Sequence, residues 1–154
     1  MNINNKRLIL EQLDAKIKLY NEVAHIPPPG DGWIQGIRTA LNMTLGQLAK
    51  KMKITSPSLK NFETREKQGN ITLNSLKQIA NALDMQLVYA IIPKEGSLDD
   101  MVDAKAWEKA REIVNRTANT MALEDQANEQ GRLMQAFQDK KNELKNEIPK
   151  FLWD

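Results

Sequence analysis

The spacing of apolar residues predicts a chain built mainly from helices. Over residues 5–24 the apolar side chains recur every three or four positions, which places them on one face of an amphipathic helix: Ile9, Leu13, Ile17, Tyr20 and Ala24. The segment HIPPPGDG that follows holds three prolines and two glycines, so it is expected to form a linker. We therefore predict an N-terminal helix and linker over residues 1–31.

Residues 32–84 show the same helical spacing in short blocks. The pattern predicts four short helices with tight connections, and Thr44 and Thr72 each stand where an N-cap is expected. Leu48 and Ala49 are predicted to face inward from their spacing. Ala49 is small where the two helices must cross closely. This region is predicted to be one helical domain, and its expected inward residues also include Ile34, Ile37, Leu41, Ile54, Leu59, Phe62, Leu73, Leu76 and Leu83.

The stretch KITSPSLKNFETRE, residues 53–66, predicts the second helix of a helix-turn-helix. Thr55 or Ser56 is expected to cap this helix, and Pro57 then falls in the first turn, where no helical bond needs its missing N–H. Small polar residues would form the exposed face, which suits insertion into the major groove of DNA. The residues predicted to face base edges are Ser56, Pro57, Ser58, Lys60 and Asn61.

Residues 85–93, MQLVYAIIP, change the pattern from helix to strand. An isolated strand leaves its backbone groups without partners, and the simplest partner is the same strand in a second copy. We therefore predict a homodimer in which this strand is the contact, through Leu87, Val88, Tyr89 and Ile91.

Residues 94–154 return to helical spacing. Ser97 is expected to cap a helix whose first turn holds Asp99 and Asp100, and Pro149 ends a last helix. Trp107 is predicted to lie in the core and Trp153 at an interface. The predicted inner stripes are Val102, Ala106, Ala110, Val114, Thr117 and Met121, followed by Leu133, Phe137, Leu144 and Ile148.

Charge divides the chain into two parts. Residues 1–93 hold 12 Lys/Arg and 7 Asp/Glu, whereas residues 94–154 hold 10 and 13. A basic front part and an acidic rear part suggest a polyanion partner for the first and a protein partner for the second. The residues predicted to meet DNA phosphates are Arg38, Thr44, Lys50, Lys51, Lys53 and Lys67.

Several function classes are disfavoured by composition. The chain has no cysteine and a single histidine, His25, and it lacks a glycine-rich phosphate loop. We therefore expect neither an enzyme nor a metal or cofactor site. There is no long apolar run and no secretion signal, so we expect a cytoplasmic protein without a membrane segment.

The motifs of residues 33–84 resemble the Cro/C1-type, phage repressor-like DNA-binding domain. The resemblance implies a mainly α fold: a five-helix Cro/C1-type helix-turn-helix domain, then one dimerisation β-strand and C-terminal helices. Two positions depart from the family pattern, because Lys53 stands where many members have glycine and Leu45 where many have glutamine. The matching residues are Thr44, Leu48, Ala49, Ser56, Leu59, Phe62, Glu63, Thr72, Leu73, Ala80 and Leu83.

The whole chain also resembles the mobile mystery protein A family, through GWIQGIRTALNMTLGQLA, LVYAIIP, TMALEDQ and the ending LWD. This resemblance implies an antitoxin that represses its own operon from an inverted-repeat operator and is the partner of a Fic-domain toxin. Thr120, Glu124 and Asp125 resemble a Fic-inhibiting Ser/Thr-x-x-x-Glu-Gly/Asn helix, apart from the last position. Two alternatives stay open: a Fic inhibitor with little DNA-binding role, and a stand-alone phage-type repressor. Glu124 could equally be a solvated helix end.

Overall fold

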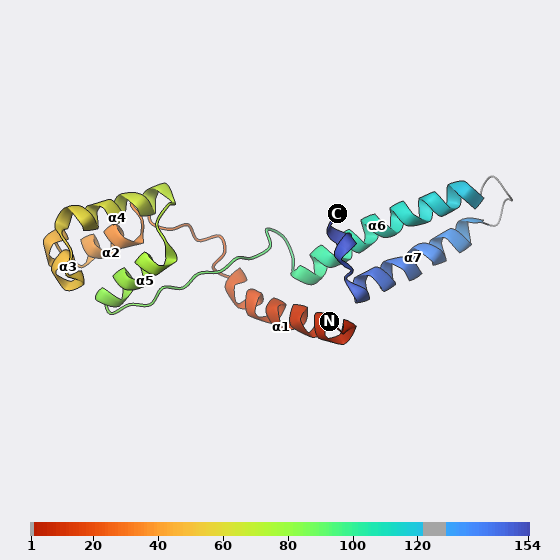
Figure 1. The fold of residues 1–154 in the computed structure, drawn as a ribbon, viewed down its shortest axis with the longest axis horizontal. Helices are drawn as coiled ribbons and strands as arrows, with labels where there is room; N and C mark the ends of the chain where they lie inside the picture. The colour runs from red at the N-terminus through yellow and green to blue at the C-terminus, as the bar shows by residue number, and fades with distance from the viewer. Residues whose placement is uncertain (1, 122–128) are drawn as a thin grey trace. The chain divides into compact units, whose positions relative to one another are not determined.

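The computed structural model describes residues 2–121 and 129–154, without the side chains of residues 118–121 and 129. Over these residues the chain forms seven α-helices, one 3₁₀-helix and no strand (Figure 1). The contacts divide the chain into two compact units, one formed by residues 23–90 and the other by residues 1–22 together with 91–154. The N-terminal helix thus belongs with the C-terminal helices, and each unit has its own core.

The unit of residues 23–90 is the helix-turn-helix unit. In its described residues it holds four helices where the resemblance implied five: α2 (Trp33–Ala40), α3 (Leu45–Met52), α4 (Ser56–Gln68) and α5 (Leu73–Ala82). The predicted five-helix count is therefore wrong, because the additional N-terminal helix packs in the other unit.

Threonine side chains cap three of these helices, α3 at Thr44, α4 at Thr55 and α5 at Thr72. The hydroxyl of Thr44 accepts a hydrogen bond from the N–H of Gln47 at 3.1 Å, and that of Thr72 accepts one from Ser75 at 3.0 Å. Each bond satisfies a backbone donor that the first helical turn leaves unpaired. Both predicted N-caps are confirmed.

An apolar cluster holds the four helices together. Its buried members come from all four helices and are Ile34, Leu48, Ala49, Leu59 and Ile79. The turn residue Ile54 packs against them, as predicted. Leu41 and Leu73 were predicted to face inward, but their exposed fractions are 54% and 45%. Both stand at a helix end, where no neighbouring helix covers them.

Residues 85–93 do not form the predicted dimerisation strand in the single chain. Strand hydrogen bonds need a neighbouring strand, and residues 2–121 and 129–154 contain none. Figure 1 shows the segment as an extended run between α5 and α6. Its apolar side chains stay exposed, with fractions of 63% for Val88, 59% for Tyr89 and 91% for Ile91.

The second unit, here called the helical unit, is built on a hairpin of two long helices. It consists of α1 (Ile3–Asn21), α6 (Leu98–Met121), α7 (Glu129–Glu147) and the 3₁₀-helix η1 (Lys150–Trp153). The predicted inner stripes are confirmed where they are fully buried, at Val102, Ala106, Ala110 and Leu144, which pack with Leu152 of η1. Three of these residues are small or short, so the apolar core of this unit is thin.

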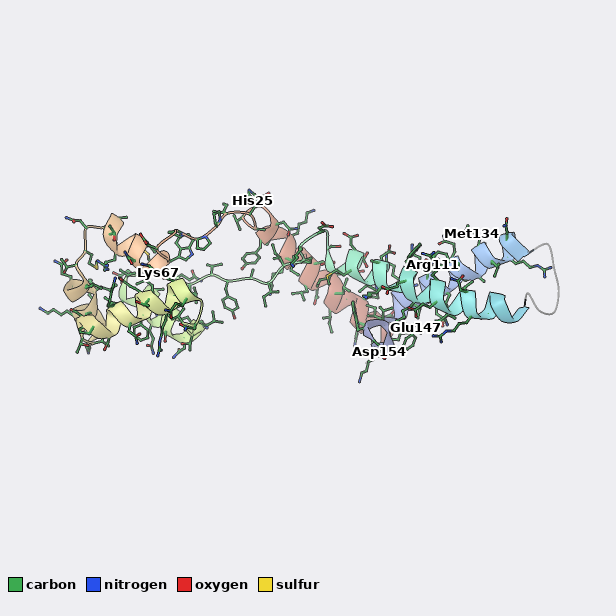
Figure 2. The ribbon with its side chains drawn as sticks, turned by 90° about the horizontal axis from the view of Figure 1, so that it is seen from above. His25, Lys67, Arg111, Met134, Glu147 and Asp154 are labelled. Carbon is green, nitrogen blue, oxygen red and sulfur yellow. The ribbon has the colours of Figure 1, made fainter. Side chains whose placement is uncertain are left out.

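Helix α1 is held on the hairpin largely by polar contacts. The Asp14 carboxylate accepts hydrogen bonds from the backbone N–H groups of Leu98 at 2.8 Å and Asp99 at 3.0 Å, which fastens α1 to the start of α6. Arg7 pairs with the Asp99 carboxylate at 2.8 Å. Lys6 donates a hydrogen bond of 3.0 Å to the backbone carbonyl of Glu147. Glu147 is labelled in Figure 2.

These contacts rotate α1 away from the predicted orientation. Ile17 of the predicted stripe is buried as expected, and Leu10 packs against the hairpin core, whereas Ile9 and Leu13 of that stripe are 51% and 46% exposed. The inward placement of Ile9 and Leu13 was wrong, because the polar bonds of Arg7 and Asp14 set the rotation of the helix.

A charged cluster links all three helices of the helical unit. Lys145 of α7 lies 3.3 Å from the carboxylates of both Asp99 and Asp103 on α6. Partial burial acts to raise the pKa of Asp99, but hydrogen bonds from Arg7 and Lys145 outweigh it and hold that pKa below its ordinary value. For Lys145 the burial acts to lower the pKa, and its bonds to Asp99 and Asp103 raise it above the ordinary value. Both shifts favour the charged pair.

Two tryptophans lie at the surface of the helical unit. Trp107 was predicted to lie in the core, yet 45% of it is exposed, with its ring edge-on to Phe137 at 5.9 Å. The Arg111 guanidinium covers the Trp107 ring at 5.2 Å from its centre, so the exposed ring face is partly shielded. Trp153 is 51% exposed. None of the described helices is apolar over a length that would cross a membrane.

Candidate DNA interface

A tight turn joins α3 to α4 and fixes the angle between them. Lys53 ends α3 in the left-handed conformation, with φ of 57°, and the N–H of Ile54 donates to the carbonyl of Ala49 at 3.0 Å. Thr55 then caps α4 by accepting a bond from the N–H of Ser58 at 3.3 Å. Thr55, rather than Ser56, is therefore the cap. These three residues form the turn of a helix-turn-helix.

Helix α4 presents a polar face to solvent, as predicted. Pro57, Ser58, Lys60 and Asn61 are exposed, while Ser56 is half-buried. Pro57 is the second residue of the helix, where its missing N–H has no intrahelical partner to lose. The Ser58 hydroxyl lies 2.8 Å from that of Thr55, so the N-terminal turn has an ordered hydroxyl pair. The structure thus brings the predicted base-reading residues together on one helix surface.

The opposite face of α4 carries a buried ion pair that anchors the helix. Glu63 is 1% exposed, and its carboxylate accepts hydrogen bonds from Arg38 of α2, at 2.6 Å from Nε and 3.3 Å from Nη2. Arg38 also donates from Nη1 to the carbonyl of Met43 at 3.0 Å. One guanidinium therefore joins α2, the loop after it and α4.

This pairing gives Arg38 a different place from the one predicted. Arg38 was expected to meet a DNA phosphate, but its donors are directed at Glu63 and Met43, and only 13% of its side chain is exposed. The sequence pattern did not single out Glu63 as a functional residue. Its place four residues after the inward Leu59 is a signal, because an acidic residue on an apolar face needs a buried cationic partner.

Lys60 lies next to this buried pair. Its ammonium group is 3.8 Å from the Glu63 carboxylate, and 53% of the side chain is exposed. Because Arg38 already makes two hydrogen bonds to that carboxylate, most of the Lys60 donor capacity remains available to a ligand. The Lys60 ammonium group therefore lies at the edge of the pair, and about half of the side chain is open to solvent.

The predicted phosphate-binding residues fall into two groups. Lys50, Lys51 and Lys53 are exposed and have no acidic partner within 4.0 Å in the described part of the chain. Lys67, labelled in Figure 2, pairs with the exposed Asp31 at 3.5 Å. The Thr44 side chain is engaged in its capping box with Gln47. Among the predicted phosphate-binding residues, the three lysines at the end of α3 are therefore the ones whose charge is available to a phosphate.

The residues that resemble a Fic-inhibiting motif are not placed. Glu124 and Asp125 lie outside the described residues, and Thr120 belongs to the last turn of α6 without a described side chain.

Comparison with known families gives one match. Residues 34–89 match the helix-turn-helix family model, which is about a third of the chain. The match supports a helix-turn-helix of the Cro/C1 type over this part of the chain. The match supports a sequence-specific DNA-binding regulator. No curated protein and no solved structure matched the chain.

Proposed function

We propose that the protein is a transcriptional repressor that reads its operator with α4. The observation that carries this proposal is the two-sided character of that helix, with Leu59 and Glu63 fixed in the core and Lys60 and Asn61 exposed. A helix anchored in this way presents base-reading side chains in a defined orientation, as major-groove readout requires.

The charge of the helix-turn-helix unit supports a DNA partner. Residues 23–90 hold eight Lys/Arg and four Asp/Glu. Two of the four acidic residues have internal roles: Glu63 pairs with Arg38, and Glu66 accepts bonds from the N–H groups of Trp33 and Ile34. The remaining surface is therefore strongly basic, which favours a polyanion.

Each exposed residue of α4 has a contact that its chemistry allows. Lys60 donates to guanine O6 and N7, Asn61 pairs with adenine, and the Ser58 hydroxyl serves either base. Pro57 has no N–H and contacts an apolar group such as a thymine methyl. Lys50, Lys51 and Lys53 meet phosphates and set the register of the protein on the duplex.

The decisive experiment replaces Lys60 and Asn61 with alanine. The operator is selected from a random duplex library with the wild-type protein, and the binding of operator and scrambled duplex is then compared by fluorescence anisotropy. Each lost base contact is expected to cost about 1–3 kcal/mol of discrimination. Asn74→Ala with Lys77→Ala, on the exposed surface of α5, is the matched control and should keep the preference.

The phosphate lysines are distinguished by their response to salt. Lys50→Ala and Lys51→Ala are each expected to weaken both duplexes alike and to reduce the log–log salt slope by about one unit. A variant of Lys60 and Asn61 that retains full operator preference would contradict α4 as the reading helix.

We further propose that this repressor is a dimer and that it acts as the antitoxin of a Fic-type toxin encoded beside it. Two binding units would recognise half-sites about 34–36 Å apart. The proposal is supported by the resemblance of the whole chain and by a separate helical unit whose exposed Trp107 and Trp153 suit a protein interface.

The antitoxin role is tested by co-expression with the product of the neighbouring reading frame. Wild-type chain is expected to restore growth, and Trp153→Ala to reduce capture of the toxin, while operator binding stays unchanged. Glu124→Ala tests the inhibitory motif separately, since loss of inhibition without loss of capture would identify that glutamate. Capture without operator binding would favour the inhibitor alternative, and operator binding without capture the stand-alone repressor.

A further inference from the structure

An apolar groove lies between α2 and α5 in the helix-turn-helix unit. Its volume is about 320 Å³, and one side of it is formed by the extended residues 86–88. Most of the remaining lining is apolar and includes Trp33, Ile37, Leu76 and Leu83. The groove is therefore bounded by the segment that was predicted to pair with a second copy.

The two backbone edges of this segment differ in the N–H donors that they offer. In the described structure, residues 86–92 make no backbone hydrogen bond. The N–H of Met85 is already used, because it donates to the carbonyl of Ala80 at 2.8 Å, and Pro93 has no N–H. In a strand, alternate residues direct both polar groups to the same edge. Met85 and Pro93 are an even number of residues apart, so both lie on the same edge. The other edge, formed by residues 86, 88, 90 and 92, keeps every donor free within the described residues.

These positions restrict how two copies can pair. In an antiparallel ladder, hydrogen-bonded residues stand opposite hydrogen-bonded residues, and opposite side chains point to the same face. Met85 and Pro93 must both occupy non-hydrogen-bonded positions. A two-fold axis through Tyr89 places them opposite each other, and it pairs the whole segment from 85 to 93.

Charge favours the same register. The segment from 85 to 93 is uncharged, and Asp84 and Lys94 are the first charged residues on either side of it. An axis through Tyr89 brings Asp84 of one copy near Lys94 of the other, just beyond each end of the ribbon. Registers centred on residue 88 or 90 would lose these two pairings and shorten the ladder.

We propose that a second copy of the chain covers the groove through this ribbon. Residues 85–93 pair antiparallel about a two-fold axis at Tyr89, and Ile91 of the second copy lies beside Leu87 over the apolar groove. The occupant is a second copy because the segment supplies both a free hydrogen-bonding edge and an uncharged, self-complementary set of side chains. Ile91, which is 91% exposed in the single chain, becomes covered. This proposal rests on the dimer of the proposed function and specifies its contact.

Engineered cysteines test the register directly, since the chain has no cysteine of its own. Opposite residues at a non-hydrogen-bonded position have Cα atoms about 4.5 Å apart, within the range that a disulfide spans. The full-length Tyr89→Cys variant is therefore expected to form a covalent dimer under mild oxidation. Val88→Cys is the matched control, because two residues 88 would be separated by more than about 7 Å. An equimolar mixture of Leu87→Cys and Ile91→Cys chains should cross-link faster than either variant alone.

A second measurement tests the groove contact. In sedimentation velocity, Ile91→Asp is expected to raise the dimer dissociation constant at least about tenfold, whereas Leu19→Asp on the exposed face of α1 should not. Circular dichroism establishes that both variants keep their helices.

The outcomes separate this inference from the proposed function. A chain that is dimeric but fails to cross-link at residue 89, or that cross-links more readily at residue 88, overturns the register and leaves the repressor intact. A chain that stays monomeric at all concentrations overturns the ribbon altogether. Operator preference, measured with the Lys60 and Asn61 variants, decides the reading helix independently of either result.

Discussion

The helix-turn-helix unit and the helical unit are both small all-α assemblies, but their charged residues lie in different places. In the first, one ion pair is buried at the centre, where Arg38 and Glu63 join α2 to α4 beneath the exposed polar face of α4. In the second, the charges of Arg7, Asp99 and Lys145 lie at the rim, around a core rich in alanine. Removing one partner of a buried pair leaves an uncompensated buried charge, whereas ion pairs that solvent screens contribute little to stability.

The largest effect is expected from breaking the buried pair. Glu63→Ala leaves the Arg38 guanidinium buried without its carboxylate partner, which typically destabilises by about 3–5 kcal/mol. The loss should appear in urea unfolding followed by the fluorescence of Trp33, the one tryptophan in the sequence of residues 23–90. For this measurement Trp107 and Trp153 are replaced by phenylalanine.

The control for this prediction removes both charges together. Arg38→Met with Glu63→Leu is expected to lose much less stability than Glu63→Ala, since no unpaired charge remains. If Glu63→Ala costs less than about 1 kcal/mol, the pair is not the anchor of α4.

In each unit, one acidic side chain accepts hydrogen bonds from the first N–H groups of a helix, so the two residues can be compared directly. Glu66 accepts bonds from the first N–H groups of α2, and Asp14 accepts bonds from those of α6. Replacing either by alanine is expected to cost about 1–2 kcal/mol, as for loss of a helix cap. Hydrogen exchange should show the loss of Glu66 in α2 only and that of Asp14 in α6 only. Faster exchange in α6 after loss of Glu66, or in α2 after loss of Asp14, would contradict the independence of the two units.

A smaller, stabilising effect is expected at the turn. Lys53 has a positive φ of 57°, which costs a residue with a Cβ more than it costs glycine. Lys53→Gly is therefore expected to raise the unfolding free energy of the helix-turn-helix unit by about 0.5–1 kcal/mol, after the greater entropy of the unfolded glycine is subtracted. Its salt slope on DNA should fall by about one unit, as for Lys53→Ala. Lys53→Ala should bring no stabilisation.

The smallest effect is expected from pH, and it should appear in the helical unit. The pKa of Asp99 is lowered in the folded chain, so the stability it contributes is present above about pH 4 and is lost as the pH falls through the lowered value. The pKa of Lys145 is raised, so its contribution is present below about pH 10 and is lost as the pH rises further. Thermal unfolding of Asp99→Asn should show a weaker acid dependence than wild type. An unchanged acid limb would mean that the rim cluster adds no stability.

Much of the helix-turn-helix unit could be predicted from the sequence because its signals are local. Thr44 and Thr72 each bind a backbone N–H three residues later, and Pro57 marks the first turn of α4. The exposed face of α4 followed from helical spacing alone. A pattern of this kind needs no knowledge of what packs against it.

Long-range contacts explain where sequence reasoning failed. Whether Ile9 and Leu13 or Leu10 face inward depends on the bond between Asp14 and the N–H of Leu98, 84 residues further along the chain. The strand predicted at 85–93 is not seen, because a ladder requires a second strand and the described residues of the single chain contain none.

By itself the sequence determined the helices of the helix-turn-helix unit, their caps and the polar face of α4, since these depend on residues within one or two turns of each other. Only the tertiary structure decided that Arg38 supports α4 from beneath, that Glu63 is its partner, and that α1 packs with the C-terminal helices. Such choices depend on which charged group reaches which partner in three dimensions, and spacing along the chain does not encode that distance.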